Sequence, residues 1–276
     1  MSPAEPNEDD DAILLVGAGR MGGAMLDGWL TRGVAGSRIA VLDPQPSGTL
    51  RALCDRHGVS LNPETVSPVA TLVLAVKPQV LDASAPGVEP WAGPGTVVVS
   101  ILAGRTLADL AGRFPRAGGV VRAMPNLPVS VGRGVTGMAS DGRVSDAALD
   151  RVERWLGAVG RVERLSHERE IDMVTAVSGS GPAYVFLLAE VLARAGERLG
   201  LPPDLAARLG RATVEGAGEL MHRNPAVAPA ILRQNVTSPG GTTAAALAVL
   251  MADDALGPLL DRAVDAAFRR AQDLSH

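Results

Sequence analysis

The chain has 276 residues, of which 46% are apolar and 20% charged, a composition typical of a globular protein with a sizeable core. Its net charge of −4 argues against nucleic acid or an anionic membrane as a partner, and its one cysteine excludes an internal disulfide. No uninterrupted apolar run reaches membrane-span length and no signal segment is visible, so we expect a cytoplasmic protein. The acidic residues 1–11 are predicted to form a disordered tail.

A dinucleotide-binding unit is predicted to begin at residue 12. The apolar run 12–16 suits a buried parallel strand, and Gly17-Ala18-Gly19-Arg20-Met21-Gly22 follows directly, then a helical stretch over 23–32. We expect Gly17 to permit a tight turn, Gly19 to admit a pyrophosphate, and Gly22 to let the helix pack on the strand. A second strand over 38–42 ends at Asp43, about 20 residues beyond the last glycine, where the acid of such a unit binds ribose.

The alternation of strands and helices continues, which predicts a doubly wound, mostly parallel sheet over residues 12–165. Further strands are expected at 71–76, 96–102, 119–123 and 161–165. Three of them end at Lys77-Pro78, Ala103-Gly104 and Met124-Pro125-Asn126, and ligands bind at the carboxyl ends of such strands. Lys77 is the only lysine of the chain. A solvated surface charge is its ordinary role, but its place at a strand end favours a cofactor contact.

The second part of the chain, residues 166–276, is predicted to be all-helical. Alanine- and leucine-rich stretches suggest helices at 169–177, 182–199, 203–222, 243–251 and 254–274. The stretch 182–199 is apolar almost all round in its first half, so its surface must be buried. A subunit interface in a homo-oligomer would bury it, and the alternative is the central helix of a monomeric bundle.

The segment from Asn235 to Thr243 is the most informative part of the chain. It contains three threonines, one serine and two glycines, and it leads into a helix. Glycines allow backbone N–H groups to approach a ligand, and a helix N-terminus favours an anion such as a carboxylate. Taken alone, the segment also fits an ordinary capped helix start.

These features together resemble the pyrroline-5-carboxylate reductase family. The resemblance runs from Ile13 to about Ala271 and is carried by Gly17–Gly22, Ala75–Pro78, Met124–Pro128, Ser178–Tyr184 and Val236–Thr243. The last two motifs are the specific ones, because the glycine motif is shared by many dehydrogenases. The resemblance implies a Rossmann domain, a helical dimerisation and substrate domain, and dimers that often assemble further, up to decamers. It also implies reduction of 1-pyrroline-5-carboxylate to L-proline, with NADH or NADPH as cofactor.

The resemblance also assigns roles to individual residues. Backbone N–H groups around Gly240, Gly241 and Thr242 would hold the substrate carboxylate, and the Thr243 hydroxyl would face the ring nitrogen. A glutamate of the family's substrate site falls on Glu168. The cofactor would be contacted by Gly17, Ala18, Gly19, Arg20, Met21, Gly22, Asp43, Asn62, Ala75, Val76, Lys77, Pro78, Ala103 and Asn235.

The chemistry implied by this resemblance makes few demands on side chains. The sequence shows no strong general acid, and a protonated imine accepts hydride without one, so catalysis would be mostly positioning. The four histidines show no ligand spacing, and no metal site is expected. One departure concerns Ala226–Pro229, where the family often carries an acidic residue and a His-Pro pair. That departure puts the rim of the substrate site in doubt.

The choice of cofactor depends on Asp43. A carboxylate at the end of the second strand accepts hydrogen bonds from the ribose 2′-OH of NADH. A 2′-phosphate about 4 Å away would cost roughly 1–4 kcal/mol per charge pair. The sequence therefore favours NADH. The alternative is that the Asp43 side chain points into the Asp43-Pro44 turn and Arg51 moves into the cofactor site.

Three other functions stay open from the residues. A β-hydroxy-acid dehydrogenase relies on a lysine in its second domain, and this chain has none there. Reduction of a six-membered cyclic imine acid stays open as a side activity. A dinucleotide-sensing regulator without turnover would keep the glycine turn and lose the loop at Thr243, and both are present.

Overall fold

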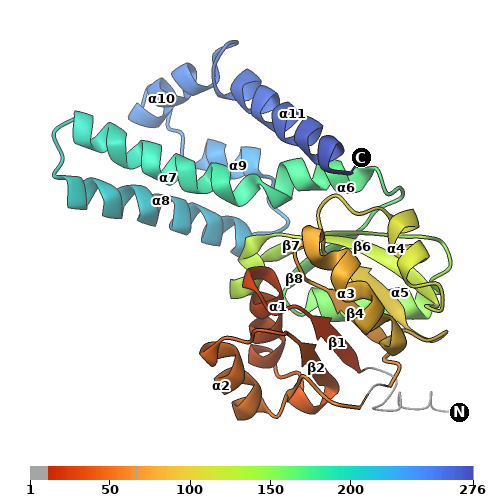
Figure 1. The fold of residues 1–276 in the computed structure, drawn as a ribbon. Coiled ribbons are helices and arrows are strands. Elements are labelled where there is room, and N and C mark those ends of the chain that lie inside the picture. The colour runs from red at the N-terminus through yellow and green to blue at the C-terminus, as the bar shows by residue number, and fades with distance from the viewer. Residues whose placement is uncertain (1–11, 66, 276) are drawn as a thin grey trace, which may run out of the picture. The chain divides into compact units, whose positions relative to one another are not determined.

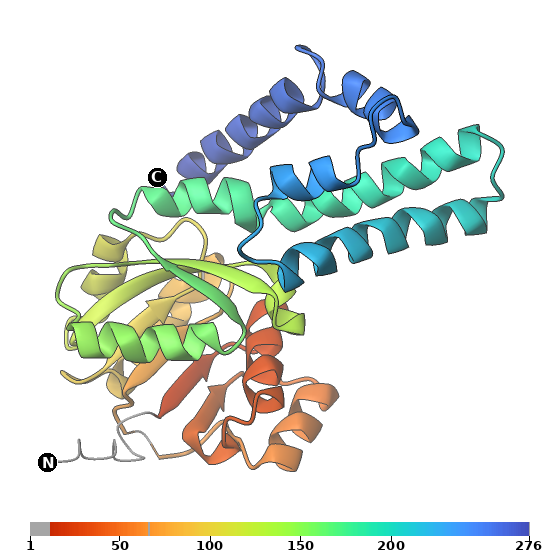
Figure 2. The same ribbon diagram turned by 180° about the vertical axis from the view of Figure 1, so that it is seen from behind.

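The structure, a computed structural model, describes residues 12–65 and 67–275, so the tail expected over 1–11 lies outside the described residues. The chain forms two compact units (Figures 1 and 2). The sheet unit extends to Gly179 and takes in the chain from Phe268 onward, and the helical unit is Ser180–Ala267. The sequence places a boundary at 165/166, whereas these compact units meet after Gly179.

The sheet unit is built on an eight-stranded sheet of order β3-β2-β1-β4-β5-β6-β7-β8. Neighbouring strands run parallel except β6 and β7, which are antiparallel. The strands are β1 (Ile13–Val16), β2 (Ile39–Leu42), β3 (Ser60–Leu61), β4 (Thr71–Leu74), β5 (Val97–Ser100), β6 (Gly119–Pro125), β7 (Gly134–Ser140) and β8 (Gly160–Arg164). The predicted doubly wound, mostly parallel sheet is thus confirmed.

Helices cover both faces of this sheet, because successive residues of each buried strand point to opposite faces. Leu15 packs in one core cluster with Trp29 of α1, whereas its neighbour Leu14 packs in a second cluster with Leu81 of α3 and Phe114. The first cluster includes residues of α1, α2 and α5, and the second includes residues of α3 and α4. The helices are α1 (Arg20–Thr31), α2 (Gly48–His57), α3 (Leu81–Val88), α4 (Leu107–Arg113), α5 (Asp146–Gly157) and α6 (Glu170–Val174), with 3-10 turns η2 (Gly36–Arg38), η3 (Pro78–Val80), η4 (Glu89–Trp91) and η5 (Leu127–Val131) and the π-helical turn η6 (Thr175–Gly179).

The first core cluster is tied across the chain by two tryptophans. The Trp29 indole donates to the Trp155 carbonyl oxygen at 2.8 Å, and the two rings meet edge to face with centroids 5.4 Å apart. Such an aromatic pair adds about 0.5–1.5 kcal/mol beyond its buried area. Cys54 is buried in the same cluster, and burial raises the pKa of its thiol, so it is a packing residue.

The helical unit consists of α7 (Gly181–Arg198), α8 (Pro203–Arg223), α9 (Pro229–Asn235), α10 (Thr242–Leu250) and the larger part of α11 (Leu256–Ser275). The predicted helices are confirmed to within a few residues, and α9 was not predicted. Figures 1 and 2 show α7 and α8 side by side. A Cβ at Gly210 of α8 would lie 2.7 Å from the Ala189 carbonyl oxygen of α7, so glycine is what permits this close approach.

Several strand boundaries and two strands differ from the sequence prediction. The strand expected over 71–76 ends at Leu74, and the one expected over 96–102 is Val97–Ser100. The strands β3 and β7 were not predicted. Glycine weakens strand signals, and β7 contains Gly134 and Gly137.

Candidate functional site

The glycine turn after β1 is shaped by two positions at which a side chain would be strained or would collide with the backbone. Gly17 has φ +88°, in the region that favours glycine, and its N–H donates to the Leu42 carbonyl oxygen at 2.8 Å. A Cβ at Gly22 would lie 2.2 Å from the Gly17 carbonyl oxygen and 3.0 Å from the Ala75 Cβ. At Gly19 a Cβ would meet nothing within 4 Å, so the space beside it is open. The turn thus forms a cradle that leads into helix α1.

The N-terminus of α1 is left available by this turn. Gly19 is its N-cap, and among the described residues no side chain caps it and no acidic residue occupies its first turn. Unpaired N–H groups and the helix dipole make such an end suited to a phosphate. Arg20 is exposed and Met21 half-buried at this end of the helix. The surface beside it, with Ala18, Gly19 and Arg20 on one side and Ser47, Gly48 and Thr49 of the α2 start on the other, is a hollow of about 790 Å³.

Asp43, the acid at the end of β2, is held in a fixed orientation. Its Oδ2 accepts from the Ala18 N–H at 3.0 Å, and its Oδ1 accepts from the Gln45 N–H at 2.9 Å. Asn62 has φ +51°, and its side-chain amide bonds the Asp43 backbone twice: Oδ1 accepts from Asp43 N–H at 2.9 Å and Nδ2 donates to Asp43 O at 2.8 Å. Two residues assigned to the cofactor are therefore brought together beside the glycine turn, with Asn62 positioning Asp43.

The ends of β4 and β5 lie next to the glycine turn at the same edge of the sheet. Ala75 N–H donates to Val16 O at 2.8 Å, which joins the end of β4 to that of β1. Lys77 is exposed and directly precedes Pro78 at the start of η3. Beyond β5 a pocket of about 620 Å³ is lined by Pro78, Gln79, Ala103, Gly104, Arg105, Thr106, Asp109 and Leu274. The structure thus brings the predicted strand-end residues to one edge.

Glu168 lies in the sheet unit and already has two partners there. Its Oε1 accepts from Arg122 Nη1 at 2.7 Å and from the Leu107 N–H, the first of α4, at 2.7 Å. Arg122 of β6 is 4% exposed, so the carboxylate satisfies a buried guanidinium. Glu168 itself keeps 31% of its side chain exposed. This pairing was not predicted, since it joins residues far apart in the sequence.

The loop before α10 belongs to the helical unit and has the features of a small anion site. Gly240 has φ +70°, and Gly241 is the N-cap of α10, with its N–H donating to Ser238 O at 3.0 Å. No side chain among the described residues caps this helix. Thr243 is half-buried in the first turn, while Thr242 is exposed. Within this unit the structure places the residues assigned to the substrate at one helix start.

The description is completed by Asn235 and by two residues to which the sequence assigned no individual role, Asn126 and Arg105. Asn235 is exposed at the end of α9, in the helical unit. Asn126, 8% exposed, donates to Ser178 O at 3.0 Å and accepts from the Val135 N–H at 2.9 Å, so it joins the end of β6 to the turn η6. Arg105 bonds the backbone of Pro78. The position of Asn126 directly after a predicted strand end was the available signal; Arg105 had none.

Sheet order, glycine turn and the acid at the end of β2 define a Rossmann-type dinucleotide-binding protein. Comparisons with known proteins agree. Residues 12–104 match the family model "NADP oxidoreductase coenzyme F420-dependent", and residues 168–274 match "Pyrroline-5-carboxylate reductase dimerisation".

Individual relatives give the same family. The chain is 37% identical to the pyrroline-5-carboxylate reductase of Pseudomonas aeruginosa, over 95% of this chain and 96% of that protein. It is 38% identical to that of Synechocystis sp., over 92% and 96%. The solved pyrroline-5-carboxylate reductase of Coxiella burnetii superposes with a TM-score of 0.88 at 33% identity, covering 97% of this chain and 99% of that one. The chain therefore belongs to the pyrroline-5-carboxylate reductase family, as its motifs predicted.

Proposed function

We propose that this protein reduces 1-pyrroline-5-carboxylate to L-proline with NADH or NADPH, the last step of proline synthesis. The observation that carries the proposal is the pairing of two specialised helix starts in one chain. One is the glycine cradle before α1, where a Cβ at Gly22 would collide with Gly17. The other is the Gly240-Gly241 start of α10, in the part of the chain that matches the family's dimerisation model. The relatives of this length are named for the same reaction.

The residues of the sheet unit fit a nicotinamide dinucleotide. The open space at Gly19 and the uncapped start of α1 suit a pyrophosphate, and the fixed Asp43 carboxylate suits ribose hydroxyls. Ala75, Val76, Lys77, Pro78 and Ala103 stand at the strand ends, where the nicotinamide half would lie, with Asn235 a further contact in the proposal. The cofactor, when bound, supplies the hydride.

The residues of the helical unit would hold the substrate. Backbone N–H groups around Gly240, Gly241 and Thr242 would bind the single carboxylate, because an uncapped helix start favours an anion. The Gly241 N–H itself donates to Ser238 O and holds the turn in shape. The Thr243 hydroxyl would orient the ring nitrogen. Catalysis then depends on positioning one electrophilic carbon, and a proton already carried by the imine reduces the need for a strong acid.

Glu168 has a more specific role in this proposal. One of its carboxylate oxygens receives Arg122 and the α4 N-terminus, which fixes the side chain while it keeps partial exposure. The family resemblance assigns Glu168 to the substrate site, and in this proposal the fixed carboxylate contributes to substrate binding.

NADH is the cofactor that Asp43 favours. Its Oδ1 does point into the Asp43-Pro44 turn, where it accepts from the Gln45 N–H, but its Oδ2 stays at the glycine turn and accepts from the Ala18 N–H. The carboxylate held in this way is not free to swing away from a 2′-phosphate. At about 4 Å such a like-charge pair costs roughly 1–4 kcal/mol. Asp43→Asn keeps an oxygen for the Ala18 N–H and removes the charge. We expect this variant to raise kcat/KM with NADPH relative to NADH by about tenfold or more.

A homodimer accounts for the apolar surface of the helical unit. Phe186, Leu187 and Leu188 of α7 are 62%, 53% and 49% exposed in the single chain. Contiguous apolar surface of this kind marks an interface. Higher assembly, up to the decamers known in the family, would bring such dimers together.

A membrane-spanning helix is a second interpretation of the same apolar surface. Residues Glu170–Arg198 are long and apolar enough to cross a membrane by length and composition, although no uninterrupted apolar run in the sequence suggested it. The start of this stretch is built into the sheet unit, where Ile171 is 1% exposed in a cluster with Met124 and Ala139. We therefore favour a cytoplasmic homo-oligomer without a membrane or nucleic-acid partner.

The test is steady-state oxidation of NADH and NADPH in parallel, with racemic 1-pyrroline-5-carboxylate as substrate and chiral detection of proline. Turnover with formation of L-proline supports the reaction, and the ratio of the two kcat/KM values measures the effect of Asp43. Binding of either cofactor with no consumption of either would overturn the proposal in favour of a regulatory role.

A further inference from the structure

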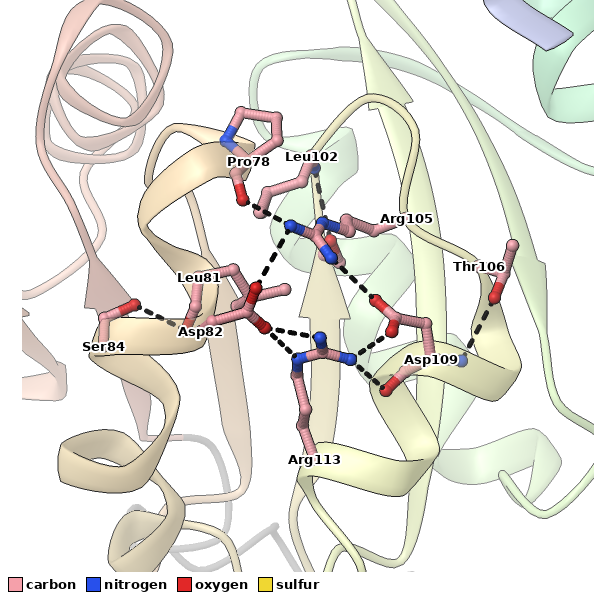
Figure 3. Close-up of polar contacts among 10 residues, drawn as sticks. Pro78, Leu81, Asp82, Ser84, Leu102, Arg105, Thr106, Asp109 and Arg113 are labelled. Atoms are coloured by element: carbon pink, nitrogen blue, oxygen red, sulfur yellow. Dashed lines mark hydrogen bonds and ion pairs between the residues drawn. The ribbon is translucent and has the colours of Figure 1, made fainter. Parts of the chain in front are cut away.

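Arg105 joins the loop after β5 to the loop after β4. Its Nη2 donates to the Pro78 carbonyl oxygen at 2.8 Å (Figure 3). The same guanidinium lies 3.7 Å from Asp82 Oδ2 and 3.5 Å from Asp109 Oδ2. Gly104, with φ +72°, turns the chain immediately before it. A single side chain thus connects the backbone at Pro78 to the starts of α3 and α4.

A second arginine completes the network behind this contact. Arg113 donates from Nε to Asp82 Oδ1 at 3.0 Å, donates to the Asp109 carbonyl oxygen at 3.1 Å, and pairs with the Asp109 carboxylate (Figure 3). Each carboxylate therefore has two guanidinium partners. Arg105 is 23% and Arg113 25% exposed, while Asp109 is 28% and Asp82 63% exposed, so the pairs with Asp109 are screened less than those with Asp82.

The position of the network distinguishes it from an ordinary helix-to-helix ion pair. Such a pair exists where α3 and α4 end: Arg116 Nε donates to Glu89 Oε1 at 2.6 Å, on side chains that are 57% and 25% exposed. That pair joins η4 to the segment after α4 and touches neither strand-end loop. Arg105, in contrast, bonds Pro78 directly and lines the pocket of about 620 Å³ between the two loops.

We propose that Arg105 is a positioning residue that sets the separation of the loops Lys77–Pro78 and Ala103–Gly104, and through it the fit of the nicotinamide half of the cofactor. This inference rests on the cofactor placement given under the proposed function. If residue 105 could not donate to the Pro78 carbonyl oxygen, this link between the two loops would be lost and the loops could move apart. The adenosine half, at the glycine turn and Asp43, does not depend on Arg105.

The experiment compares binding of NADH with binding of ADP-ribose, which lacks the nicotinamide, to the full-length chain. Arg105→Met keeps the length of the side chain and removes every donor. We expect it to raise the Kd for NADH about tenfold, since a hydrogen bond from a charged group is lost, and to leave the Kd for ADP-ribose unchanged. Arg105→Lys should restore part of the NADH affinity. Arg116→Met, which breaks the comparable pair with Glu89, should change neither Kd.

Two results would overturn the inference. NADH binding by Arg105→Met equal to that of the unchanged protein would mean that the network only joins α3 to α4. Equal weakening of NADH and ADP-ribose would mean general loosening of the sheet unit. If Arg105→Met does not fold, as judged by circular dichroism, Arg105→Gln provides the same comparison, because its shorter, uncharged side chain cannot bridge Pro78 and both carboxylates.

One further variant separates this inference from the cofactor placement. Ala103→Leu adds bulk to the loop, where Ala103 is exposed and lines the pocket. If Ala103→Leu leaves NADH binding unchanged, the cofactor does not lie at this edge. In that case both the cofactor placement and the role of Arg105 are wrong. If Ala103→Leu weakens NADH binding and Arg105→Met does not, the placement stands and the role of Arg105 is wrong.

Discussion

The two units of this chain use the same kind of apolar composition in opposite ways. In the sheet unit, strand residues and covering helices bury one another: Leu14, Leu15 and Trp29 are fully buried. In the helical unit Ala206 is the one buried hydrophobic residue among those described, while α7 has none. The sheet unit therefore has its own core, and the helical unit needs a partner surface to acquire one. Nucleotide binding should depend on the first and turnover on both.

A charge placed on the exposed face of α7 should have the largest effect. Leu187→Glu would bury an unpaired carboxylate in the proposed dimer interface, at a cost of several kcal/mol. We expect loss of the dimer in light scattering and loss of turnover, with NADH binding by the sheet unit retained. Leu187→Met, a substitution of similar volume, should keep the dimer. A fully active dimeric Leu187→Glu variant would show that α7 is not the interface.

A steric change in the glycine turn tests the sheet unit, which has its own core. A methyl group at Gly22 would lie 2.2 Å from a backbone oxygen, which cannot move aside easily. We expect Gly22→Ala to destabilise the sheet unit by about 1–3 kcal/mol and to abolish NADH binding, measured by thermal unfolding and titration. Gly19→Ala has open space and should keep its stability while losing cofactor affinity. The account is contradicted if Gly22→Ala melts and binds like the unchanged protein.

An intermediate effect is expected at Thr243 in the helical unit. Thr243→Ala should lower kcat by about ten- to hundredfold, since one hydrogen bond to a charged group is lost, with the dimer and NADH affinity unchanged. Thr243→Ser should recover most of the rate. Thr237, whose hydroxyl donates to Arg233 O at 2.6 Å, is a matched control in the same loop, and Thr237→Ala should keep kcat. Full turnover by Thr243→Ala would remove it from the mechanism.

The smallest effect concerns the surface ion pair of Glu89. The hydrogen bond from Arg116 lowers the pKa of Glu89 below its ordinary 4.5. A carboxyl whose pKa is depressed by folding contributes stability above its unfolded pKa and loses it as pH falls through the folded value. The Tm difference between the unchanged protein and Glu89→Gln should therefore be largest above pH 4.5 and shrink below it. A Tm difference that grows as the pH falls would contradict a stabilising role of the ionised Glu89 carboxylate.

The fold could be predicted where local patterns determine it. Glycine spacing, apolar strands and the acid at Asp43 gave the Rossmann unit, because each feature depends on residues near one another in sequence. The strand β7 could not be predicted, because its glycines serve packing: a Cβ at Gly137 would lie 3.0 Å from the Val174 side chain. Strand signals depend on side chains that such a position cannot carry.

The motifs predicted which residues would belong to the candidate site, but not the hydrogen-bond partners that fix their side-chain orientation. Asp43 bonding Ala18, and Glu168 bonding Arg122 across 46 residues, are properties of the folded sheet. Arg105 belongs to no motif, and its contact with Pro78 exists only because β4 and β5 end side by side.

Transfer of an isotopic label tests the proposed reaction most directly. The protein would be incubated with 1-pyrroline-5-carboxylate and NADH deuterated on the transferring face of C4, and the product analysed by mass spectrometry and NMR. The account expects L-proline carrying one deuterium at C5, the carbon of the former C=N bond. L-proline without deuterium from either face of C4, or no proline at all, would contradict direct hydride transfer by this protein.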